Sequence, residues 1–328
     1  MLNFGILGCG RIGQVHGLAI QSIPGAKVLA VSDPFDDNAQ KLAAITGAKV
    51  MSADTLISST DVDAVIIATP TTTHFDFIHA AAKAGKAIFC EKPIDMDADR
   101  IRQCIDVVGK HDVPFMTGFN RRFDRDFSTV QKRIASGEIG DVEIVTILSR
   151  DPSPPPLDYI KTSGGLFRDM MIHDFDMARF LMGEEPNSIH AVGSVLVDPQ
   201  IGKAGDVDTA AVTLTTPSGK ICQISNSRRA TYGYDQRLEV HGSLGMLRAE
   251  NVLQNGVELA SEAGFARAAT EPFFLERYRD AYAAELAHFV ACIEAGNHPY
   301  PNAEDGLKAQ LMADAATKSL QTGEVISL

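Results

Sequence analysis

A glycine-rich turn near the start of the chain constrains its fold more than any other feature. Residues 2–7 (LNFGIL) are predicted to form a strand, and a GxGxxG run follows it directly. In such a turn the first glycine permits the sharp bend, the second admits a pyrophosphate, and the third lets the next helix pack closely. The helix N-terminus then offers unpaired N–H groups to the phosphates. The pattern predicts a dinucleotide site formed by Gly8, Gly10, Arg11, Ile12 and Gly13.

An acidic residue twenty positions after this turn predicts which dinucleotide is bound. Asp33 directly follows the predicted strand 27–32. A carboxylate at this place can accept both hydroxyls of the adenosine ribose and repels a 2′-phosphate, which NADP sites usually bind with a nearby arginine. Residues 34–37 (PFDD) supply no base and two more acids. We therefore expect NAD rather than NADP.

Length, charge and cysteine content exclude several classes of protein. The 328 residues are enough for two domains, and the net charge is −12 with no basic run, which argues against nucleic acid and anionic membranes as partners. No apolar run is long enough to span a membrane, and the chain opens on a strand, so no signal peptide is expected. The scattered cysteines favour a reducing cytoplasm, with neither a disulfide nor a metal site. They are Cys9, Cys90, Cys104, Cys222 and Cys292.

The order of apolar segments predicts an α/β chain with two domains. Residues 1–118 alternate strands and helices, which predicts a doubly wound parallel sheet, the Rossmann fold. Residues 119–328 hold longer strands, and they predict a mainly antiparallel open sheet with helices on one face, for substrate binding and oligomerisation. Its predicted strands cover residues 142–150, 189–197, 209–216, 220–227 and 236–241, with a hairpin turn at 216–219. Its helices are expected at residues 168–182, 276–295 and 303–320, and the last could pack back on the first domain.

A lysine after a buried strand is the first candidate for chemistry. The run Glu91-Lys92-Pro93 follows the predicted strand 86–90. Ligands of parallel sheets bind beyond the carboxyl ends of the strands, so Lys92 is expected where the nicotinamide ring lies. Pro93 is a candidate cis proline. The alternative is a loop lysine paired with a surface acid, and its position favours the functional interpretation.

A polar stripe in the predicted helix 168–182 is the second candidate. Asp169, His173 and Asp176 are spaced i, i+4 and i+7, which places them on one helical face. The residues alone leave two interpretations open: a buried Asp–His pair that fixes packing, or a catalytic set. In a catalytic set, His173 accepts the proton of a substrate hydroxyl, Asp169 orients it, and Lys92 stabilises the developing negative charge. A stiff segment at residues 151–156 either borders this site or is a rigid connector.

The order of five motifs resembles the Gfo/Idh/MocA oxidoreductase family over essentially the whole chain. The motifs are GCGRIG (8–13), ATPTTTH (68–74), CEKP (90–93), GFNRRFD (118–124) and SGGLFRDMMIHDFDMARFL (163–181). The last two look most like family members that oxidise myo-inositol to 2-keto-inositol with NAD. The resemblance implies a catalytic triad of Lys92, Asp169 and His173, with His173 as the base.

The resemblance also implies cofactor and substrate contacts. Thr69, Pro70 and His74 follow a strand end and should line the dinucleotide cleft, and Glu91 either reaches the nicotinamide ribose or forms a plain ion pair. Asp151 stands where related inositol enzymes often carry Asn. Family members usually form tetramers through the open sheet, so a homotetramer is expected. The expected substrate contacts are Lys92, Asn120, Arg122, Asp151, Asp169, His173, Asp176 and Tyr282.

Two other functions compete with inositol oxidation. Pyranose sugars present a similar ring of hydroxyls, so a sugar dehydrogenase could use the same polar groups. A non-catalytic NAD-binding regulator is the second alternative. The intact set of Lys92, Asp169 and His173 argues against it, because a sensor needs no proton-transfer groups.

Overall fold

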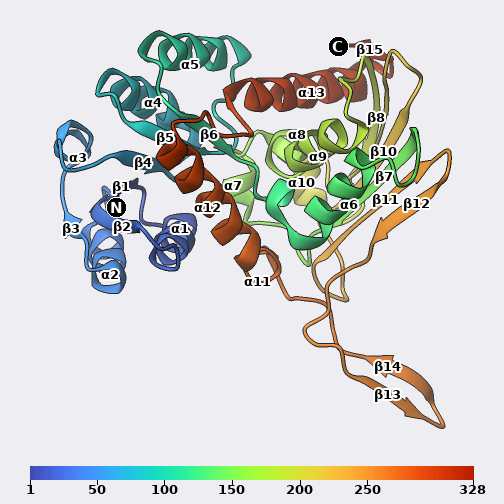
Figure 1. Cartoon of the computed structure of the whole chain (residues 1–328). Coiled ribbons are helices and arrows are strands. Elements are labelled where there is room, and N and C mark those ends of the chain that lie inside the picture. Colours follow the sequence, from blue (N-terminus) through green and yellow to red (C-terminus); the bar gives the residue numbers. More distant parts are fainter. The chain divides into compact units, whose positions relative to one another are not determined.

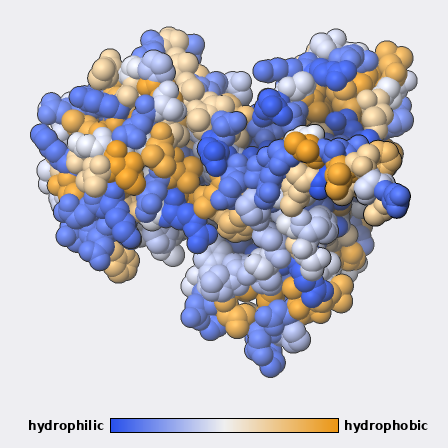
Figure 2. Space-filling model, turned by 90° about the horizontal axis from the view of Figure 1, so that it is seen from below, coloured by the Kyte–Doolittle hydropathy of each residue, from blue (hydrophilic) through white to orange (hydrophobic).

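The chain folds into two compact units, which a computed structural model describes over all 328 residues (Figure 1). Unit 1 comprises Met1–Phe123 and Asp280–Gln310, and unit 2 comprises Asp124–Arg279 and Leu311–Leu328. This division differs from the predicted boundary at residue 118, because a late segment of the chain belongs to unit 1. None of the helices is both long and apolar enough to cross a membrane. On the face drawn in Figure 2, hydrophobic groups are scattered among hydrophilic ones.

Unit 1 is built on a parallel sheet of six strands, in the order β3-β2-β1-β4-β5-β6, which confirms the predicted doubly wound fold. The strand order reverses beside β1, and ligands of such sheets bind in the crevice at this point. The strands are β1 (Leu2–Leu7), β2 (Ala26–Ser32), β3 (Lys49–Val50), β4 (Ala64–Ile67), β5 (Ala87–Glu91) and β6 (Phe115–Gly118). The helices before residue 124 are α1 (Arg11–Gln21), α2 (Asp36–Thr46), α3 (Ala53–Ser58), η1 (Thr71–Thr73), α4 (His74–Lys83), α5 (Ala98–His111) and η2 (Asn120–Phe123).

A helix from late in the chain completes the core of unit 1. The predicted helix 276–295 is two helices, α11 (Phe274–Arg277) and α12 (Arg279–Ala295). Leu286 and Phe289 of α12 are fully buried in the cluster that includes Phe4 and Phe89. The Phe289 ring centroid lies 6.2 Å from that of Phe4 and 5.9 Å from that of Phe89. Each buried apolar side chain of this size contributes about 1.5–3 kcal/mol, which explains why α12 belongs to unit 1.

Unit 2 contains a sheet of seven strands, in the order β12-β11-β7-β10-β9-β8-β15. Only β7 and β10 pair in parallel, so the predicted mainly antiparallel sheet is confirmed. The strands are β7 (Val142–Arg150), β8 (Ser188–Ser194), β9 (Thr209–Thr215), β10 (Ile221–Ser227), β11 (Asp235–Gly242), β12 (Gly245–Ala249) and β15 (Ile326–Ser327). The further helices are α6 (Arg125–Ala135), α7 (Leu157–Ile160), α8 (Gly165–Asp169), α9 (Ile172–Met182), α10 (Pro199–Lys203) and α13 (Ala303–Thr322). The boundary between the two units falls within α13, whose residues up to Gln310 belong to unit 1.

The predicted continuous helix 168–182 is wrong, because a turn separates α8 from α9. The backbone N–H groups of Met170 and Met171 both donate to the carbonyl of Leu166, at 3.0 and 2.9 Å. This shared acceptor interrupts the regular i→i−4 ladder. Asp169 therefore ends α8, and His173 begins the first turn of α9, so Asp169, His173 and Asp176 do not share one helical face.

A buried carboxylate fixes α9 to the sheet of unit 2. Asp174 is fully buried and accepts hydrogen bonds from Ser149 Oγ at 2.6 Å and Asn226 Nδ2 at 2.9 Å. Ser149 lies on β7 and Asn226 on β10. A buried carboxylate without donors is strongly unfavourable, so these two bonds determine how α9 sits on the strands.

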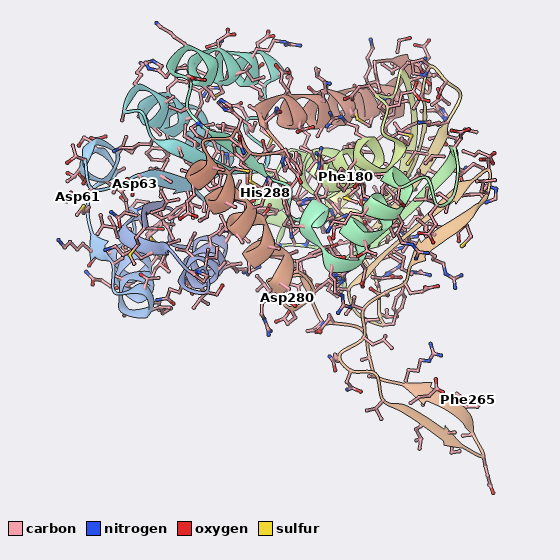
Figure 3. All side chains as sticks on the ribbon, viewed as in Figure 1. Asp61, Asp63, Phe180, Phe265, Asp280 and His288 are labelled. Atoms are coloured by element: carbon pink, nitrogen blue, oxygen red, sulfur yellow. The ribbon has the colours of Figure 1, made fainter.

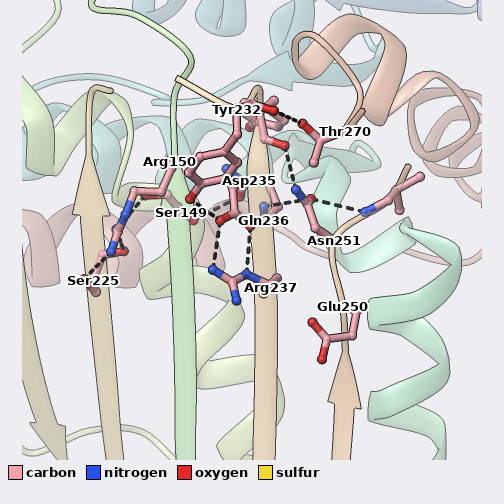
Figure 4. Close-up of polar contacts among 12 residues, drawn as sticks. Ser149, Arg150, Ser225, Tyr232, Asp235, Gln236, Arg237, Glu250, Asn251 and Thr270 are labelled. Atoms are coloured by element: carbon pink, nitrogen blue, oxygen red, sulfur yellow. Dashed lines mark hydrogen bonds and ion pairs between the residues drawn. The ribbon is translucent and has the colours of Figure 1, made fainter. Parts of the chain in front are cut away.

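Polar contacts at the strand ends hold the loop that follows β10 (Figure 4). Tyr232 donates its hydroxyl to Asp235 at 2.6 Å, and Arg237 binds the same carboxylate at 2.8 Å. On the neighbouring strands, Arg150 donates to the hydroxyl and the carbonyl of Ser225, at 2.9 and 2.6 Å. The loop of residues 228–234 is thereby tied to β11 at its far end.

A two-stranded ribbon extends away from the sheet of unit 2 (Figure 1). It consists of β13 (Glu258–Ser261) and β14 (Gly264–Arg267), and every side chain in both strands is exposed. Phe265, labelled in Figure 3, is 79% exposed near its tip. Such a hairpin is only marginally stable by itself in water.

Candidate active site

The glycine turn after β1 has the shape that a pyrophosphate requires. A Cβ atom on Gly8, whose φ is +92°, would lie 2.5 Å from the carbonyl oxygen of Ala68, and one on Gly13 would lie 2.0 Å from that of Gly8. Glycine is therefore required at positions 8 and 13 by contacts within the protein, independently of any ligand. A Cβ on Gly10 would meet nothing within 4 Å, and Gly10 caps α1 without a side-chain bond. The open backbone at a helix N-terminus therefore fits the phosphates of a dinucleotide.

Asp33 lies beside this turn with its carboxylate held by two backbone N–H groups. Its Oδ2 accepts from Cys9 at 2.7 Å, and its Oδ1 accepts from Phe35 at 2.8 Å. A carboxylate oxygen can accept more than one hydrogen bond, so these contacts orient the group without exhausting it. The fixed negative charge next to the turn fits NAD and disfavours a 2′-phosphate.

His74 joins the two loops that follow β4 and β5. Its Nε2 contacts the carbonyl of Thr69 and its Nδ1 that of Pro93, each at 2.9 Å. The side chain is buried, which lowers its pKa, and a neutral imidazole donates only one of these bonds at a time. The peptide bond between Lys92 and Pro93 is cis, as expected from the sequence. His74 therefore positions the segment that carries Lys92, while Thr69, Pro70 and His74 as direct cofactor contacts stay predictions.

Glu91 links Lys92 to the helix that follows the glycine turn. Its Oε1 contacts His16 Nε2 at 2.7 Å, and its Oε2 accepts from the backbone N–H of Lys92 at 3.3 Å. His16 is fully buried on α1, and its ring lies against Tyr282 of α12 with a centroid distance of 5.7 Å. Glu91 thus belongs to an interior contact, and its bond to the nicotinamide ribose stays a prediction.

The remaining predicted residues of unit 1 are also buried. Asn120 and Arg122 lie on η2, directly after β6, and Tyr282 lies on α12. Arg122 Nη2 donates to Asp305 Oδ1 at 3.0 Å. Asn120 and Arg122 lie beyond the carboxyl end of β6, where ligands of parallel sheets bind. Their contacts with substrate stay predictions.

In unit 2, Asp169 accepts hydrogen bonds from two side chains that the sequence analysis did not identify. Arg228 donates to Asp169 Oδ2 at 3.2 and 3.3 Å, and Tyr159 donates its hydroxyl to Oδ1 at 2.9 Å. Burial and the Asp169 charge raise the pKa of Tyr159, so the phenol keeps its proton as a donor. The side chain of Arg228 is only 1% exposed, and Asp206 Oδ2 lies 3.9 Å from it. Arg228 directly follows β10, but the rule that selected Lys92 holds for parallel sheets and does not extend to this mainly antiparallel one, so strand position did not identify it.

The other predicted residues of unit 2 lie on α9 and directly after β7. His173 lies half-buried in its first turn, and Asp176 is fully buried with Arg179 Nη1 at 3.7 Å from its carboxylate. Asp151 follows β7, where its backbone N–H donates to Ser227 at 3.0 Å. Asp169 and His173 thus lie in unit 2, whereas the glycine turn and Lys92 lie in unit 1.

These features define a class of protein, an NAD-binding oxidoreductase with an α/β fold. The comparison with known families agrees with this class. Residues 2–119 match the description "Oxidoreductase family, NAD-binding Rossmann fold", and residues 127–248 match "GFO/IDH/MocA C-terminal domain". The chain belongs to the Gfo/Idh/MocA oxidoreductase family.

Two relatives and one solved structure are similar to this chain over nearly their full length. An inositol 2-dehydrogenase of Rhizobium meliloti (strain 1021) is 53% identical over 100% of this chain and 99% of its own length. A myo-inositol 2-dehydrogenase of Thermotoga maritima is 46% identical over 100% of this chain and 98% of its own length. The crystal structure of a scyllo-inositol dehydrogenase from Lactobacillus casei, with bound NAD(H) and scyllo-inositol, is similar with a TM-score of 0.93. It is 31% identical and covers 100% of this chain and 99% of the other.

The glycine geometry predicts two different outcomes for the same substitution. Gly13→Ala should lower the melting temperature, because its methyl group meets a backbone carbonyl that cannot move away cheaply. Gly10→Ala should keep the melting temperature and weaken NAD binding, because its methyl group occupies only the open cradle. Calorimetric titration with NAD and thermal unfolding of both variants test this. Equal losses of NAD affinity without a loss of stability would contradict the assignment.

Asp33 predicts the cofactor preference. The double variant Asp33→Ser, Pro34→Arg should raise kcat/KM for NADP relative to NAD, because it exchanges a repelling charge for an attracting one. Asp33→Asn is the control, since it removes the charge without adding a base, while its one amide oxygen keeps one of the two backbone bonds, to Cys9 or to Phe35. Steady-state rates with both cofactors measure the ratio. A wild-type enzyme that uses NAD and NADP equally well would refute the role of Asp33.

Proposed function

We propose that this protein oxidises one ring hydroxyl of an inositol, myo-inositol or a close stereoisomer, to the ketone with NAD. The observation that carries the proposal is the presence of Lys92, Asp169 and His173 in a chain 53% identical to an inositol 2-dehydrogenase over its full length. The dinucleotide cradle in unit 1 and the Asp169 cluster in unit 2 supply the chemistry that such a reaction needs. When bound, NAD accepts the hydride from the carbon that carries the hydroxyl.

His173 is the proposed general base, because imidazole has an ordinary pKa of ~6.5 and can take up the hydroxyl proton at neutral pH. Asp169 orients the imidazole and favours its cationic form. Arg228 and Tyr159 hold the Asp169 carboxylate, so the orientation of Asp169 is fixed before substrate arrives. Lys92 donates a hydrogen bond to the reacting oxygen and stabilises its negative charge.

The proposed substrate contacts are polar groups that can bind several hydroxyls at once. Asp176 and Asp151 offer acceptors, and Asn120, Arg122 and Tyr282 offer donors. A pyranose sugar presents a similar ring of hydroxyls, so a sugar dehydrogenase remains the second candidate function. Both candidates use the same catalytic residues and differ in the stereochemistry of the pocket.

We also propose a homotetramer that associates through the open sheet of unit 2. The outer face of this sheet exposes apolar side chains on four strands, and Val192 is 54% and Met246 45% exposed. Ile144 and Ile221 extend the same surface on the neighbouring strands β7 and β10. Contiguous exposed apolar residues are typical of protein interfaces. The free cysteines support a cytoplasmic location, where thiols stay reduced.

Removal of the proposed base should separate chemistry from cofactor binding. His173→Ala should lower kcat by roughly 10²–10⁴-fold, because general base catalysis contributes this much. NAD affinity should be retained, since His173 is a base for the substrate and not a cofactor ligand. NADH formation and calorimetric NAD binding are measured on one preparation, with exposed His298→Ala as the control. Near-normal turnover of His173→Ala at saturating polyol would exclude the role.

A panel of substrates tests the proposed function directly. We expect the highest kcat/KM with myo-inositol or a close stereoisomer, lower values with glucose-like pyranoses, and almost none with cyclohexanol or lactate. A site that binds hydroxyls can reject analogues without them by roughly 10⁴-fold, because its polar groups are left unpaired. NADH formation across the series measures this order. Simple alcohols that match the polyols would contradict a polyhydroxyl pocket, and a clear preference for a pyranose would establish the sugar dehydrogenase.

A further inference from the structure

A cluster of three ionisable side chains lies inside unit 1, at the end of β5. His16 of α1, Glu91 of β5 and Glu285 of α12 each direct one nitrogen or oxygen atom into a common space, with all three atoms within 4.8 Å of one another. His16 and Glu285 are fully buried, and the side chain of Glu91 is 13% exposed. The cluster joins three elements that are far apart in the sequence.

The two carboxyl groups of the cluster have unequal surroundings. Glu91 Oε1 contacts His16 Nε2 at 2.7 Å, and Glu91 Oε2 accepts from the backbone N–H of Lys92 at 3.3 Å. Glu285 is fully buried, and neither of its oxygens has a hydrogen-bond donor. Burial of a carboxylate without a donor is far less favourable than burial of the neutral acid. Two carboxylates this close also repel each other strongly when both are charged.

We propose that Glu285 is a neutral carboxylic acid in the folded protein, and that it acts as a positioning residue for Glu91 and thereby for Lys92. In this proposal the negative charge of the pair belongs to Glu91, because the Lys92 N–H donates to it and His16 Nε2 lies 2.7 Å from it. Neutral Glu285 removes the repulsion that would otherwise drive the Glu91 side chain away from His16. Burial and the charge of Glu91 both raise the pKa of Glu285, in agreement with this assignment.

The arrangement connects α12 to the chemistry of the proposed site. Glu91 directly precedes Lys92, and its carboxylate binds the Lys92 backbone. Tyr282, one turn before Glu285 on α12, packs against the ring of His16. The groups that face Glu285 are thus His16 from α1 and Glu91 from β5, with Tyr282 on its own helix. The effect on turnover rests on the proposed function of Lys92, whereas the protonation of Glu285 does not.

Infrared difference spectroscopy of the whole enzyme tests the protonation directly. At pH 7 ordinary carboxyl groups are ionised, and a protonated acid gives a carbonyl band above the amide I band. The spectrum of wild type minus Glu285→Gln should show the loss of one such band. Glu294→Gln, an exposed glutamate of the same helix, is the matched control and should show none. Absence of the band from the first difference spectrum would overturn the proposal.

The pH dependence of stability provides a second measurement with a defined sign. In the unfolded chain the pKa of Glu285 returns to its ordinary value of 4.5, and in the folded protein it is higher. The stability that the proton contributes is complete below the unfolded pKa and is lost as pH rises toward the folded pKa. Glu285→Gln keeps a neutral side chain at every pH. Its unfolding constant relative to wild type should therefore fall tenfold per pH unit within this window.

Two further results decide between the possible states of the cluster. A stoichiometric divalent metal, detected by elemental analysis in wild type and lost in Glu285→Gln, would overturn the proposal in favour of a charged ligand. Glu285→Leu should lower kcat by up to ~10²-fold, because a displaced Lys92 loses its alignment, and Glu285→Gln should lower it less. If no polyol is oxidised and the infrared band is present, the proposed function fails and the protonation of Glu285 stands. If polyols are oxidised and the band is absent, this inference fails alone.

Discussion

The close approach of backbone segments at the strand-order reversal of unit 1 is the constraint on which the dinucleotide site depends. The turn after β1 touches both the start of α1 and the end of β4, at distances that leave no room for a Cβ on Gly8 or Gly13. Because this contact fixes the axis of α1, it directs the helix N-terminus toward the open space beside Gly10. The carboxylate of Asp33 binds the same turn at Cys9. The cofactor cradle is therefore a consequence of backbone packing, and side chains refine it.

Buried polar side chains position the other elements and residues of the candidate site. Asp174 fixes α9 to the sheet, Arg228 holds Asp169 at the end of α8, and His16 holds Glu91 beside Lys92. Each of these buried groups has a polar partner, which offsets the cost of its desolvation. Of the candidate catalytic residues, Asp169 is thus held at its side chain by buried Arg228, and Lys92 is held at its backbone by Glu91. The contact with Arg228 restricts the rotamer of Asp169 before any ligand binds.

Much of the fold was predictable because its signals are local. Strands β1 and β7 have the predicted bounds, and the turn at residues 216–219 joins β9 to β10 as expected. The errors arise where a local pattern does not contain the decisive contact. The sequence predicts a helix over residues 276–295, but its local pattern cannot tell which core receives Phe289. The ribbon β13–β14 escaped prediction because its side chains are all exposed, so no alternation of apolar residues marks it.

In the candidate site, too, local sequence patterns reveal some residues and not the tertiary contacts of the others. Lys92 and the glycine turn are predictable because their roles follow from a place relative to a strand, which sequence spacing reveals. Arg228, His16 and Glu285 act through partners that lie 59, 75 and 194 positions away along the chain. Their residue types are also unremarkable in their local patterns, since a helix tolerates one polar residue such as His16 or Glu285 on an apolar face, and an arginine is common in a loop such as the one after β10. Only the fold shows that Glu285 has no donor, and its protonation is therefore a property of tertiary structure. The chemistry of the site is encoded in motifs, and the electrostatic support for it is encoded in contacts between motifs.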